Sequence, residues 1–315
     1  MRAVAVLKTG DVPGLMELPV PRPAPGEVLV KLTAASVNPM DMGIAMGLIP
    51  LPQTFPLVLG VDGAGRVTEA GEGVRGLKPG DTVHGQFFRA PLGHGTFADY
   101  AVVTEFPDNG ALQPTPDGMP ADIAAALPTA GMTAVGVLDA IGLRGGQSIL
   151  IVGATGGVGV FAVQLAAASG AEVIATARQE AEGWIRGLGA AQTVDYTAGE
   201  VAEQIRKTHP DGVDAVLDMT RDPARFAENA ALVRDGGMAV SVGLIAPPEL
   251  LASERISVSN FMMHDKPDLL ARITAEVTSG RVTVPIQQTV SLDEVPEALA
   301  RNFAGGARGK TTVRI

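Results

Sequence analysis

The chain has 315 residues, of which 46% are hydrophobic, so it is long enough for two ordinary domains and too apolar to be disordered. It has no cysteine, which excludes disulfides, thiolate zinc sites and cysteine nucleophiles. The net charge of −10 and the lack of a dense Lys/Arg cluster argue against a nucleic-acid or anionic-membrane partner. The apolar run at the N-terminus is too short for a signal peptide, and we expect a cytoplasmic protein.

Residues 1 to about 120 have the pattern of many short strands. Alternating apolar residues over the first half of Glu27–Val37 indicate a half-buried strand, and glycine and proline punctuate the runs that follow it. This part of the chain is therefore predicted to be a partly open barrel or a sandwich. Its further strands are expected at Gly65–Glu69, Asp81–Phe88 and Thr96–Val103.

From about Ala121 the pattern changes to helices, first at Ala121–Leu127 and Ala130–Leu143, and then to strands that alternate with helices. That alternation predicts an α/β fold with a doubly wound parallel sheet. Strands are expected at Gln192–Asp195, Asp214–Asp218, Met238–Val242 and Ser257–Met263, and helices at Glu180–Leu188, Glu200–Lys207, Ala224–Arg234 and Asp268–Thr278. From Val284 we expect a strand (Val284–Val290), a short helix (Leu292–Asn302) and a last strand (Thr311–Ile315).

The rest of the chain is organised around Ser148–Arg178, which has the pattern of a βαβ unit. A β-branched strand (Ser148–Val152) leads through a glycine-rich turn into a helix (Val160–Ser169), and a second strand follows at Glu172–Thr176. Unpaired N–H groups at such a helix start can bind a pyrophosphate, which approaches closely only over glycine. The alternative is a turn whose glycines serve packing alone. The turn and its glycines argue against a membrane-spanning helix here.

The cofactor type is predicted from the end of the second strand. NAD sites place an acid about twenty residues after the glycine turn, whereas this strand leads to Arg178, nineteen positions after Gly159. Arginine can bond two oxygens of a 2′-phosphate, so the sequence favours NADPH over NADH. The alternative is an ordinary solvated arginine at a strand end.

In order and spacing, short motifs over nearly the whole chain resemble the medium-chain dehydrogenase/reductases, and among them the zinc-independent quinone oxidoreductases. These motifs include Val37–Asp41, Gly60–Gly65, Lys78–Asp81, Phe97–Tyr100, Gly131–Ala134, Thr155–Gly159, Leu188–Ala190, Val194–Tyr196, Gly212–Asp214, Gly236–Gly237 and Gly309–Lys310. The resemblance implies a GroES-like β-rich catalytic domain formed by residues 1–120 and 284–315. It implies a Rossmann dinucleotide-binding domain at residues 121–283, and a nicotinamide cleft.

The resemblance also implies the cofactor contacts. The pyrophosphate turn is Thr155, Gly156, Gly157 and Val158, and the contacts to the phosphate of the adenine ribose are Arg178 and Tyr196. Thr133 lies beside the nicotinamide, backbone partners of its amide are Val242, Gly243 and Leu244, and a late cofactor loop contains Asn260 and Phe261. The alternatives are that Tyr196 is an ordinary packed aromatic residue and that Thr133 is a helix hydroxyl with a local hydrogen-bond partner.

The sequence departs from the zinc alcohol dehydrogenases of this superfamily. Gly60 is followed by Val61 and Asp62 instead of His-Glu, and no cysteine is present. His84 and His94 alone do not make a catalytic zinc site, and we interpret them as loop or barrel residues, with a substrate contact as the alternative. Gly43 stands where quinone reductases often have a tyrosine, so substrate preference is not carried over. No metal is predicted.

Without a Lewis acid, hydride addition to a quinone or an α,β-unsaturated carbonyl is easier than alcohol oxidation. Asn38 is the candidate catalytic residue, as a donor or positioner for the acceptor oxygen, and otherwise a turn residue before Pro39. Asp41 is expected to be a structural acceptor. No proton donor is evident, and solvent or the cofactor ribose is expected to supply the proton. The leading hypothesis is an NADPH-dependent quinone or enone reductase. The second is a non-catalytic NADPH-binding redox sensor or structural protein.

Two further expectations concern partners. Met40, Met42, Met46, Phe87 and Phe88 suggest an apolar cleft for a small, electron-poor carbonyl or quinone substrate. The apolar stretch Ile256–Met263 suits pairing across a homodimer edge, with burial under a helix as the alternative.

Overall fold

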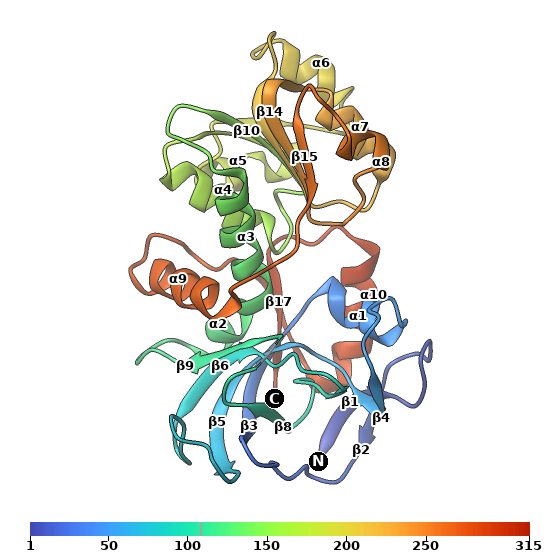
Figure 1. Ribbon diagram of the computed structural model, residues 1–315, viewed down its shortest axis with the longest axis vertical. Helices are drawn as coiled ribbons and strands as arrows, with labels where there is room; N and C mark the ends of the chain where they lie inside the picture. The colour runs from blue at the N-terminus through green and yellow to red at the C-terminus, as the bar shows by residue number, and fades with distance from the viewer. Residues whose placement is uncertain (108) are drawn as a thin grey trace. The chain divides into compact units, whose positions relative to one another are not determined.

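The computed structural model describes residues 1–107 and 109–315 (Figure 1). Contacts between residues divide the chain into two compact units. Unit 1 comprises Met1–Met132, Asp265–Gly280 and Val284–Ile315, and unit 2 comprises Thr133–His264 and Arg281–Thr283. The ends of the chain therefore both belong to unit 1.

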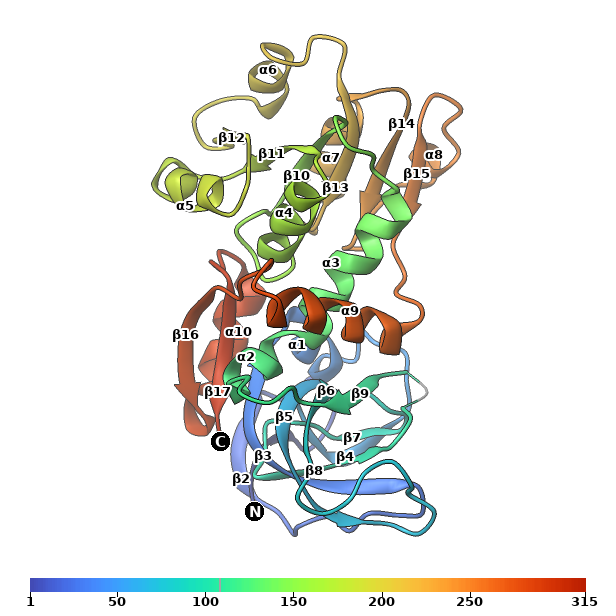
Figure 2. The same cartoon turned by 90° about the vertical axis from the view of Figure 1, so that its left-hand side faces the viewer.

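This division differs from the sequence-based boundaries, because residues 121–132 and 265–280 belong to unit 1. The reason lies in helix α9 (Lys266–Thr278), which packs beside strand β9 (Ala111–Pro114) of unit 1 (Figure 2). Gly131 also faces this helix, since a Cβ placed on it would lie 2.6 Å from Cγ1 of Ile273.

Unit 1 contains two sheets, in agreement with the predicted β-rich architecture. The smaller sheet has the order β2-β1-β4-β7, and the larger has the order β16-β17-β3-β5-β6-β9, with β8 also paired to β3. The strands not yet given are β1 (Arg2–Val6), β2 (Gly14–Glu17), β3 (Glu27–Val37), β4 (Gln53–Val58), β5 (Asp62–Ala70), β6 (Thr82–Gln86), β7 (Leu92–His94), β8 (Tyr100–Thr104), β16 (Ile286–Ser291) and β17 (Lys310–Arg314).

Short helices complete unit 1. They are α1 (Pro39–Ala45), α2 (Ala121–Ala126), α10 (Val295–Ala304) with the 3₁₀ turn η2 (Leu292–Glu294) before it, and the start of α3 (Pro128–Ile141). α1 packs on α10, and both contribute side chains to a core that includes Val37, Leu59 and Phe97. The segment around Asn38 lies beside the start of β17, where Thr311 pairs with Val37.

Unit 2 is built on a six-stranded parallel sheet with the order β12-β11-β10-β13-β14-β15. The chain moves outward from β10 to β12 and then crosses to β13, so the order reverses between β10 and β13. Ligands of such sheets bind at the carboxyl ends of the strands at this reversal. The strands are β10 (Ser148–Val152), β11 (Glu172–Thr176), β12 (Gln192–Val194), β13 (Val213–Asp218), β14 (Val233–Ser241) and β15 (Ser257–Asn260).

Helices flank both faces of this sheet, as the sequence predicts for a doubly wound fold (Figure 1). Every residue of β10 is buried, which agrees with its continuous apolar, β-branched sequence. Besides the later part of α3, the helices are α4 (Gly159–Ala168), η1 (Gln179–Ala181), α5 (Glu182–Gly187), α6 (Val201–Arg206), α7 (Pro223–Ala230) and α8 (Pro248–Leu251).

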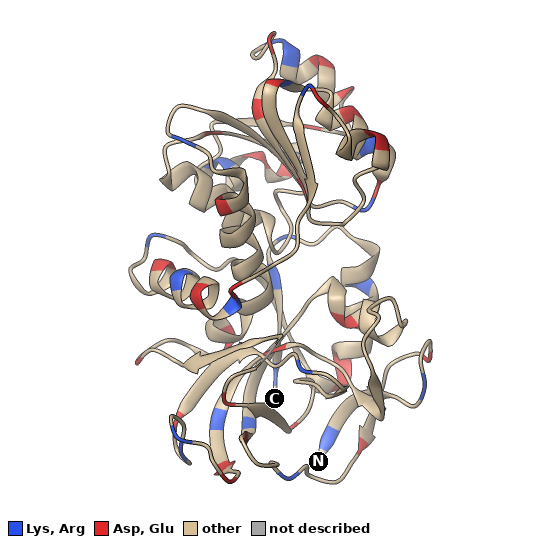
Figure 3. Ribbon diagram, in the orientation of Figure 1, with Lys and Arg blue, Asp and Glu red and all other residues tan. Residues whose placement is uncertain are grey.

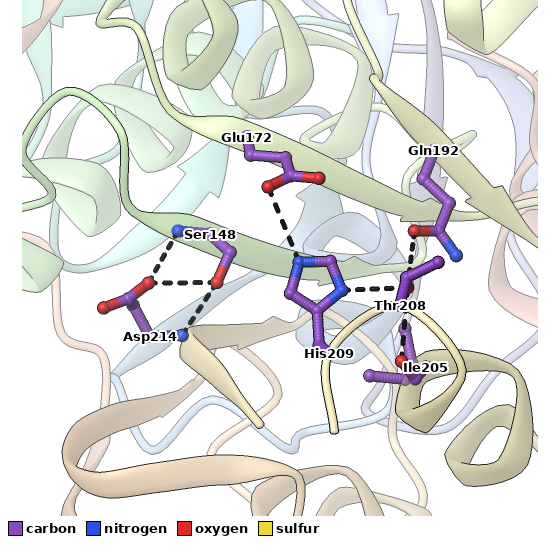
Figure 4. Close-up of polar contacts among 7 residues, drawn as sticks. All are labelled: Ser148, Glu172, Gln192, Ile205, Thr208, His209 and Asp214. Carbon is purple, nitrogen blue, oxygen red and sulfur yellow. Dashed lines mark hydrogen bonds and ion pairs between the residues drawn. The ribbon is translucent and has the colours of Figure 1, made fainter. Parts of the chain in front are cut away.

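At the amino ends of these strands, polar side chains pair with one another (Figure 4). The Ser148 hydroxyl donates to Asp214 at 3.0 Å, and His209 Nε2 lies 3.5 Å from the Glu172 carboxylate. Thr208 donates to Gln192 at 2.9 Å. These contacts tie the amino edge of the sheet together.

The structure corrects several predicted elements. The helix predicted at Ala224–Arg234 ends at Ala230, because β14 already begins at Val233. The strand predicted at Ser257–Met263 ends at Asn260. Helix α1 and strands β1, β2, β4, β7 and β9 were not predicted.

Charged residues of both signs are interspersed along the elements (Figure 3). Among the described residues, no helix is both long and apolar enough to cross a membrane.

Candidate functional site

Most of the residues predicted to bind a dinucleotide gather at the carboxyl edge of the unit 2 sheet. The glycine turn follows β10, Arg178 follows β11 and Tyr196 follows β12. The loop from Val242 to Leu244 follows β14, and Asn260 ends β15. Because parallel strands end at the same edge, this topology brings together loops that the sequence separates by more than one hundred residues.

The glycine turn has the geometry that an approaching phosphate needs. Gly153 has φ +85°, and a Cβ on Gly159 would lie 2.4 Å from the Gly153 carbonyl oxygen. Among the described residues, the N–H groups of Gly157 and Val158 have no backbone acceptor at the start of α4. This cradle of open backbone donors fits a pyrophosphate.

Arg178 and Tyr196 are brought together, as the resemblance implies. The Nε of Arg178 donates to the Tyr196 hydroxyl at 3.1 Å, and the guanidinium lies 5.9 Å from the centre of the tyrosine ring. Hydrogen bonding to Tyr196 raises the pKa of Arg178, so the group stays charged. The Nε–H group is therefore occupied by Tyr196. Arg178 is exposed, and the remaining N–H groups of its guanidinium can bond an anion.

A side-chain bond joins the loop after β14 to the end of β15, and the loop after β13 lies close to the loop after β14. Asn260 accepts a hydrogen bond from the Ala246 N–H at 3.0 Å, which ties the end of β15 to the loop containing Val242, Gly243 and Leu244. A Cβ on Gly243 would lie 2.3 Å from the Thr220 carbonyl oxygen. Leu244 has φ +58°, a strained value for leucine, and its side chain is exposed.

Sequence reasoning missed Asp218, the buried carboxylate that shapes the loop after β13. It accepts bonds from the N–H and hydroxyl of Thr220, both at 2.7 Å, and from Asn229. An Asp followed two residues later by Thr at a strand end is the sequence signal that could have predicted this hydrogen-bonded turn.

Two further predicted cofactor residues lie in different places. Thr133 is buried inside α3, whereas the Phe261 N–H donates to the Ser241 carbonyl next to the loops described above.

A second polar cluster lies in the interior of unit 1 around Asn38. Its amide is oriented by two bonds, because Oδ1 accepts from the Lys310 ammonium at 2.7 Å and Nδ2 donates to Asp62 at 2.9 Å. Its other N–H is directed to the Ser36 carbonyl at 3.3 Å. Both N–H groups have protein acceptors, so this geometry suits a positioner more than a donor to a bound oxygen.

Two carboxylates and one ammonium share this buried cluster. Asp41 accepts from the N–H groups of Asn38 and Val61 and closes the first turn of α1, which agrees with its predicted structural role. Asp62 accepts from the Thr129 hydroxyl at 2.7 Å. Burial raises the pKa of Asp41 to about 8 and also raises that of Asp62, while it lowers the pKa of Lys310. Sequence reasoning assigned no role to Asp62 or Lys310.

Some members of the resembled superfamily bind zinc, but the possible metal ligands among the described residues do not fit a zinc ion. His84 is buried, with Nδ1 bonded to Thr115 and Nε2 to Thr274. In the part of the chain that the structure describes, no group of three or more His, Cys, Asp or Glu side chains is placed to hold a metal ion. With no cysteine in the chain, no thiolate ligand exists.

Unit 1 contains a small apolar hollow, about 20 Å³ in volume, whose lining includes two residues of the predicted substrate cleft. Phe87 and Phe88 line it, together with apolar residues of β4 and the two polar side chains Arg89 and His94. Met40 and Met42 instead pack against the core, and Met46 is exposed.

Comparisons with known proteins agree with this organisation. Residues 24–113 match the alcohol dehydrogenase GroES-like domain model, and residues 157–271 match the model of the zinc-binding dehydrogenases. The chain is 31% identical to the human mitochondrial NAD(P)H oxidoreductase RTN4IP1, over 92% of this chain and 82% of the relative. It is 31% identical to the 2-methylene-furan-3-one reductase of Solanum lycopersicum, over 91% and 71%. The solved quinone oxidoreductase of Coxiella burnetii is 26% identical, with a TM-score of 0.89 over 100% of this chain and 99% of that one.

Proposed function

Because the chain belongs to the medium-chain dehydrogenase/reductase superfamily, in its quinone oxidoreductase branch, we propose that it is an NADPH-dependent reductase of quinones and α,β-unsaturated carbonyls. The chain is an oxidoreductase with a nicotinamide cofactor. One observation carries the finer proposal, namely that a glycine cradle and the Arg178–Tyr196 pair lie along the same carboxyl edge of one parallel sheet.

The cofactor is proposed to bind along this edge. The turn from Thr155 to Val158 holds the pyrophosphate through backbone N–H groups, and Arg178 binds the 2′-phosphate. When bound, NADPH supplies the hydride. Val242, Gly243 and Leu244 remain the proposed partners of the nicotinamide amide, and Thr133, Asn260 and Phe261 complete the proposed set.

The acceptor is proposed to be a small, apolar molecule that takes the hydride's electron pair onto its own carbonyl oxygen. The names of the tomato relative and the Coxiella structure support this class. No step through a metal ion is proposed, because the donor set described above does not fit one. Asn38 is retained as a positioner, since it links Lys310 to Asp62.

NADPH oxidation by the purified chain with a panel of quinones and enones tests the proposal. Turnover with either acceptor class, and a clear preference for NADPH over NADH, is the expected result. Tight NADPH binding without turnover on any acceptor would instead favour a non-catalytic NADPH-binding protein. Cytoplasmic localisation also stays a prediction, and the human relative is named as mitochondrial.

A further inference from the structure

Lys266 stands at a place where local rules disfavour a lysine. It is the first residue of α9, a thirteen-residue helix, so its cation lies at the positive end of the helix dipole. Its side chain is half-buried, which also disfavours the charged form. Departures from local preference of this kind concentrate at functional positions.

The backbone around Lys266 is held in place. Asp265 before it adopts a left-handed conformation with φ +49°, which aspartate tolerates better than most residues, and Pro267 after it has a restricted φ. The entry to α9 therefore has little freedom, and the lysine side chain starts from a defined position.

The ammonium group of Lys266 has fixed partners for two of its N–H groups. It donates to Gln86 Oε1 at 2.9 Å and to the Asn109 carbonyl oxygen, and it lies 5.2 Å from the centre of the Phe88 ring. An ammonium has three N–H donors. Within the described part of the chain, the third has no oxygen acceptor.

Fixed partners extend from Lys266 into the buried cluster. Gln86 donates its amide to the Thr129 hydroxyl at 2.7 Å, and that hydroxyl donates to Asp62. Gln86 is completely buried, so Lys266 is attached to a rigid support. The neighbouring Phe87 and Phe88 line the apolar hollow of unit 1.

We propose that the third N–H of Lys266 binds the carbonyl oxygen of an enone acceptor and donates the proton that completes its reduction. This rests on the proposed reductase function. Burial lowers the pKa of Lys266, although the nearby Asp62 charge opposes that shift, and a lowered pKa makes the ammonium a better acid.

In the proposed step, the enone receives a hydride at its β-carbon from NADPH, which is oxidised to NADP⁺. The new C–H bond forms as the C=C π bond breaks, and the electron pair moves onto the carbonyl oxygen as an enolate. One N–H bond of Lys266 then breaks, and the proton passes to this oxygen to form an enol. The enol becomes the ketone in water, and the neutral amine regains its proton from water.

Quinones provide an internal comparison. Hydride addition to a quinone gives a hydroquinone anion, which is stabilised by its aromatic ring and is protonated readily in solvent. An acid within the protein should therefore matter much more for enones than for quinones.

The experiment compares steady-state turnover of an enone and a quinone by the wild type, K266M, K266R and the control K31M. Lys31 is exposed on β3, in the same unit. K266M is expected to lower kcat for the enone by about 100-fold, with kcat for the quinone and the NADPH dissociation constant little changed. K266R keeps the charge but not the readily released proton, so it should remain slow with the enone.

Several results would overturn the inference. They are wild-type enone turnover in K266M, equal losses with both acceptors, weakened NADPH binding that accounts for the loss, or full enone turnover in K266R. A wild type that reduces quinones but no enone would also overturn it. If K266M does not fold, the ratio of enone turnover to quinone turnover in K266R decides the question. Absence of turnover by the wild type with every acceptor would instead refute the proposed function.

Discussion

The ammonium of Lys310 lies 2.7 Å from Oδ1 of Asn38, although 272 residues separate them along the chain. Both residues are buried, and the bond connects the last strand of unit 1 to the start of α1. Through Asn38 the ammonium is linked to Asp62, and it also offsets the charge of Asp41. The charge of Lys310 therefore acts on both carboxylates of the buried cluster.

Lys310→Met should destabilise the protein by about 3–5 kcal/mol, because it removes the ammonium that Asn38 links to the buried Asp62 carboxylate. Urea unfolding measures this loss. Lys8→Met, at an exposed position, is the control and should change stability by less than about 0.5 kcal/mol. Combining Lys310→Met with Asp62→Asn should cost less than the sum of the single changes. Additive losses would contradict the electrostatic explanation.

The buried ring of His84 predicts a loss of stability in acid. Gln113 donates to Nε2 at 3.2 Å, which indicates a neutral ring, and burial lowers the pKa of His84 to about 4. Between pH 6.5 and 4 the unfolded chain binds the extra proton, so the free energy of unfolding falls as the pH falls. This group should account for roughly 3 kcal/mol between pH 7 and pH 4.

His84→Gln should remove that share of the pH dependence, whatever its effect at pH 7. The measurement is the free energy of unfolding at both pH values for the wild type, His84→Gln and the exposed-site control His264→Gln. The same decrease in all three proteins would show that the ring of His84 is not the group responsible.

The parts of the fold that follow from local pattern could be predicted from the sequence. The predicted bounds of Ser148–Val152 and Glu172–Thr176 coincide with β10 and β11, since continuous burial requires continuous apolar residues. Helix α1 was missed although a signal was present. Asn38, Pro39 and Asp41 form an N-terminal cap, with Asp41 accepting the Asn38 N–H at 2.7 Å.

The polar cluster of unit 1 could not be predicted, because its contacts are set by tertiary packing. Lys266 reaches Gln86 across 180 residues, and Thr129 reaches Asp62 across 67. No local periodicity or spacing encodes such pairs. The role of Asn38 could not be predicted for the same reason. Whether its side-chain amide is free to bind substrate depends on where β17 and Asp62 lie in the fold.

Gly159→Ala should disrupt the cofactor turn. The added Cβ would lie 2.4 Å from one backbone oxygen and 2.6 Å from another, so the turn must shift. We expect a loss of about 1–3 kcal/mol in stability together with weaker NADPH binding. Gly183→Ala is the matched control, because that helical position is open and alanine should stabilise it by about 0.5–1 kcal/mol. Unchanged NADPH affinity in Gly159→Ala would contradict the proposal that the glycine turn binds the pyrophosphate.

The edge strand β15 supports the homodimer prediction. It ends the sheet of unit 2, and Ser257 on it is exposed, so a second copy can pair with its free edge. Sedimentation should give the mass of a dimer for the wild type and of a monomer for Ser257→Lys/Ser259→Lys. Gln192→Lys on β12, at the opposite edge, should remain dimeric. A wild-type monomer would refute the prediction, and a dimeric double-lysine variant would place the interface elsewhere.

Arg178→Ala should separate the two nicotinamide cofactors. Removing a guanidinium that bonds a 2′-phosphate should weaken NADPH binding by about 1.5–3 kcal/mol and leave NADH binding nearly unchanged, because NADH has no phosphate there. Tyr196→Phe should weaken NADPH binding by about 1 kcal/mol. The ring stays beside the guanidinium, but the hydroxyl that bonds Nε is lost. Arg186→Ala, at an exposed ion pair in α5, is the control. Fluorescence titration with each cofactor measures these affinities, and equal losses for NADPH and NADH in Arg178→Ala would mean that Arg178 does not read the phosphate.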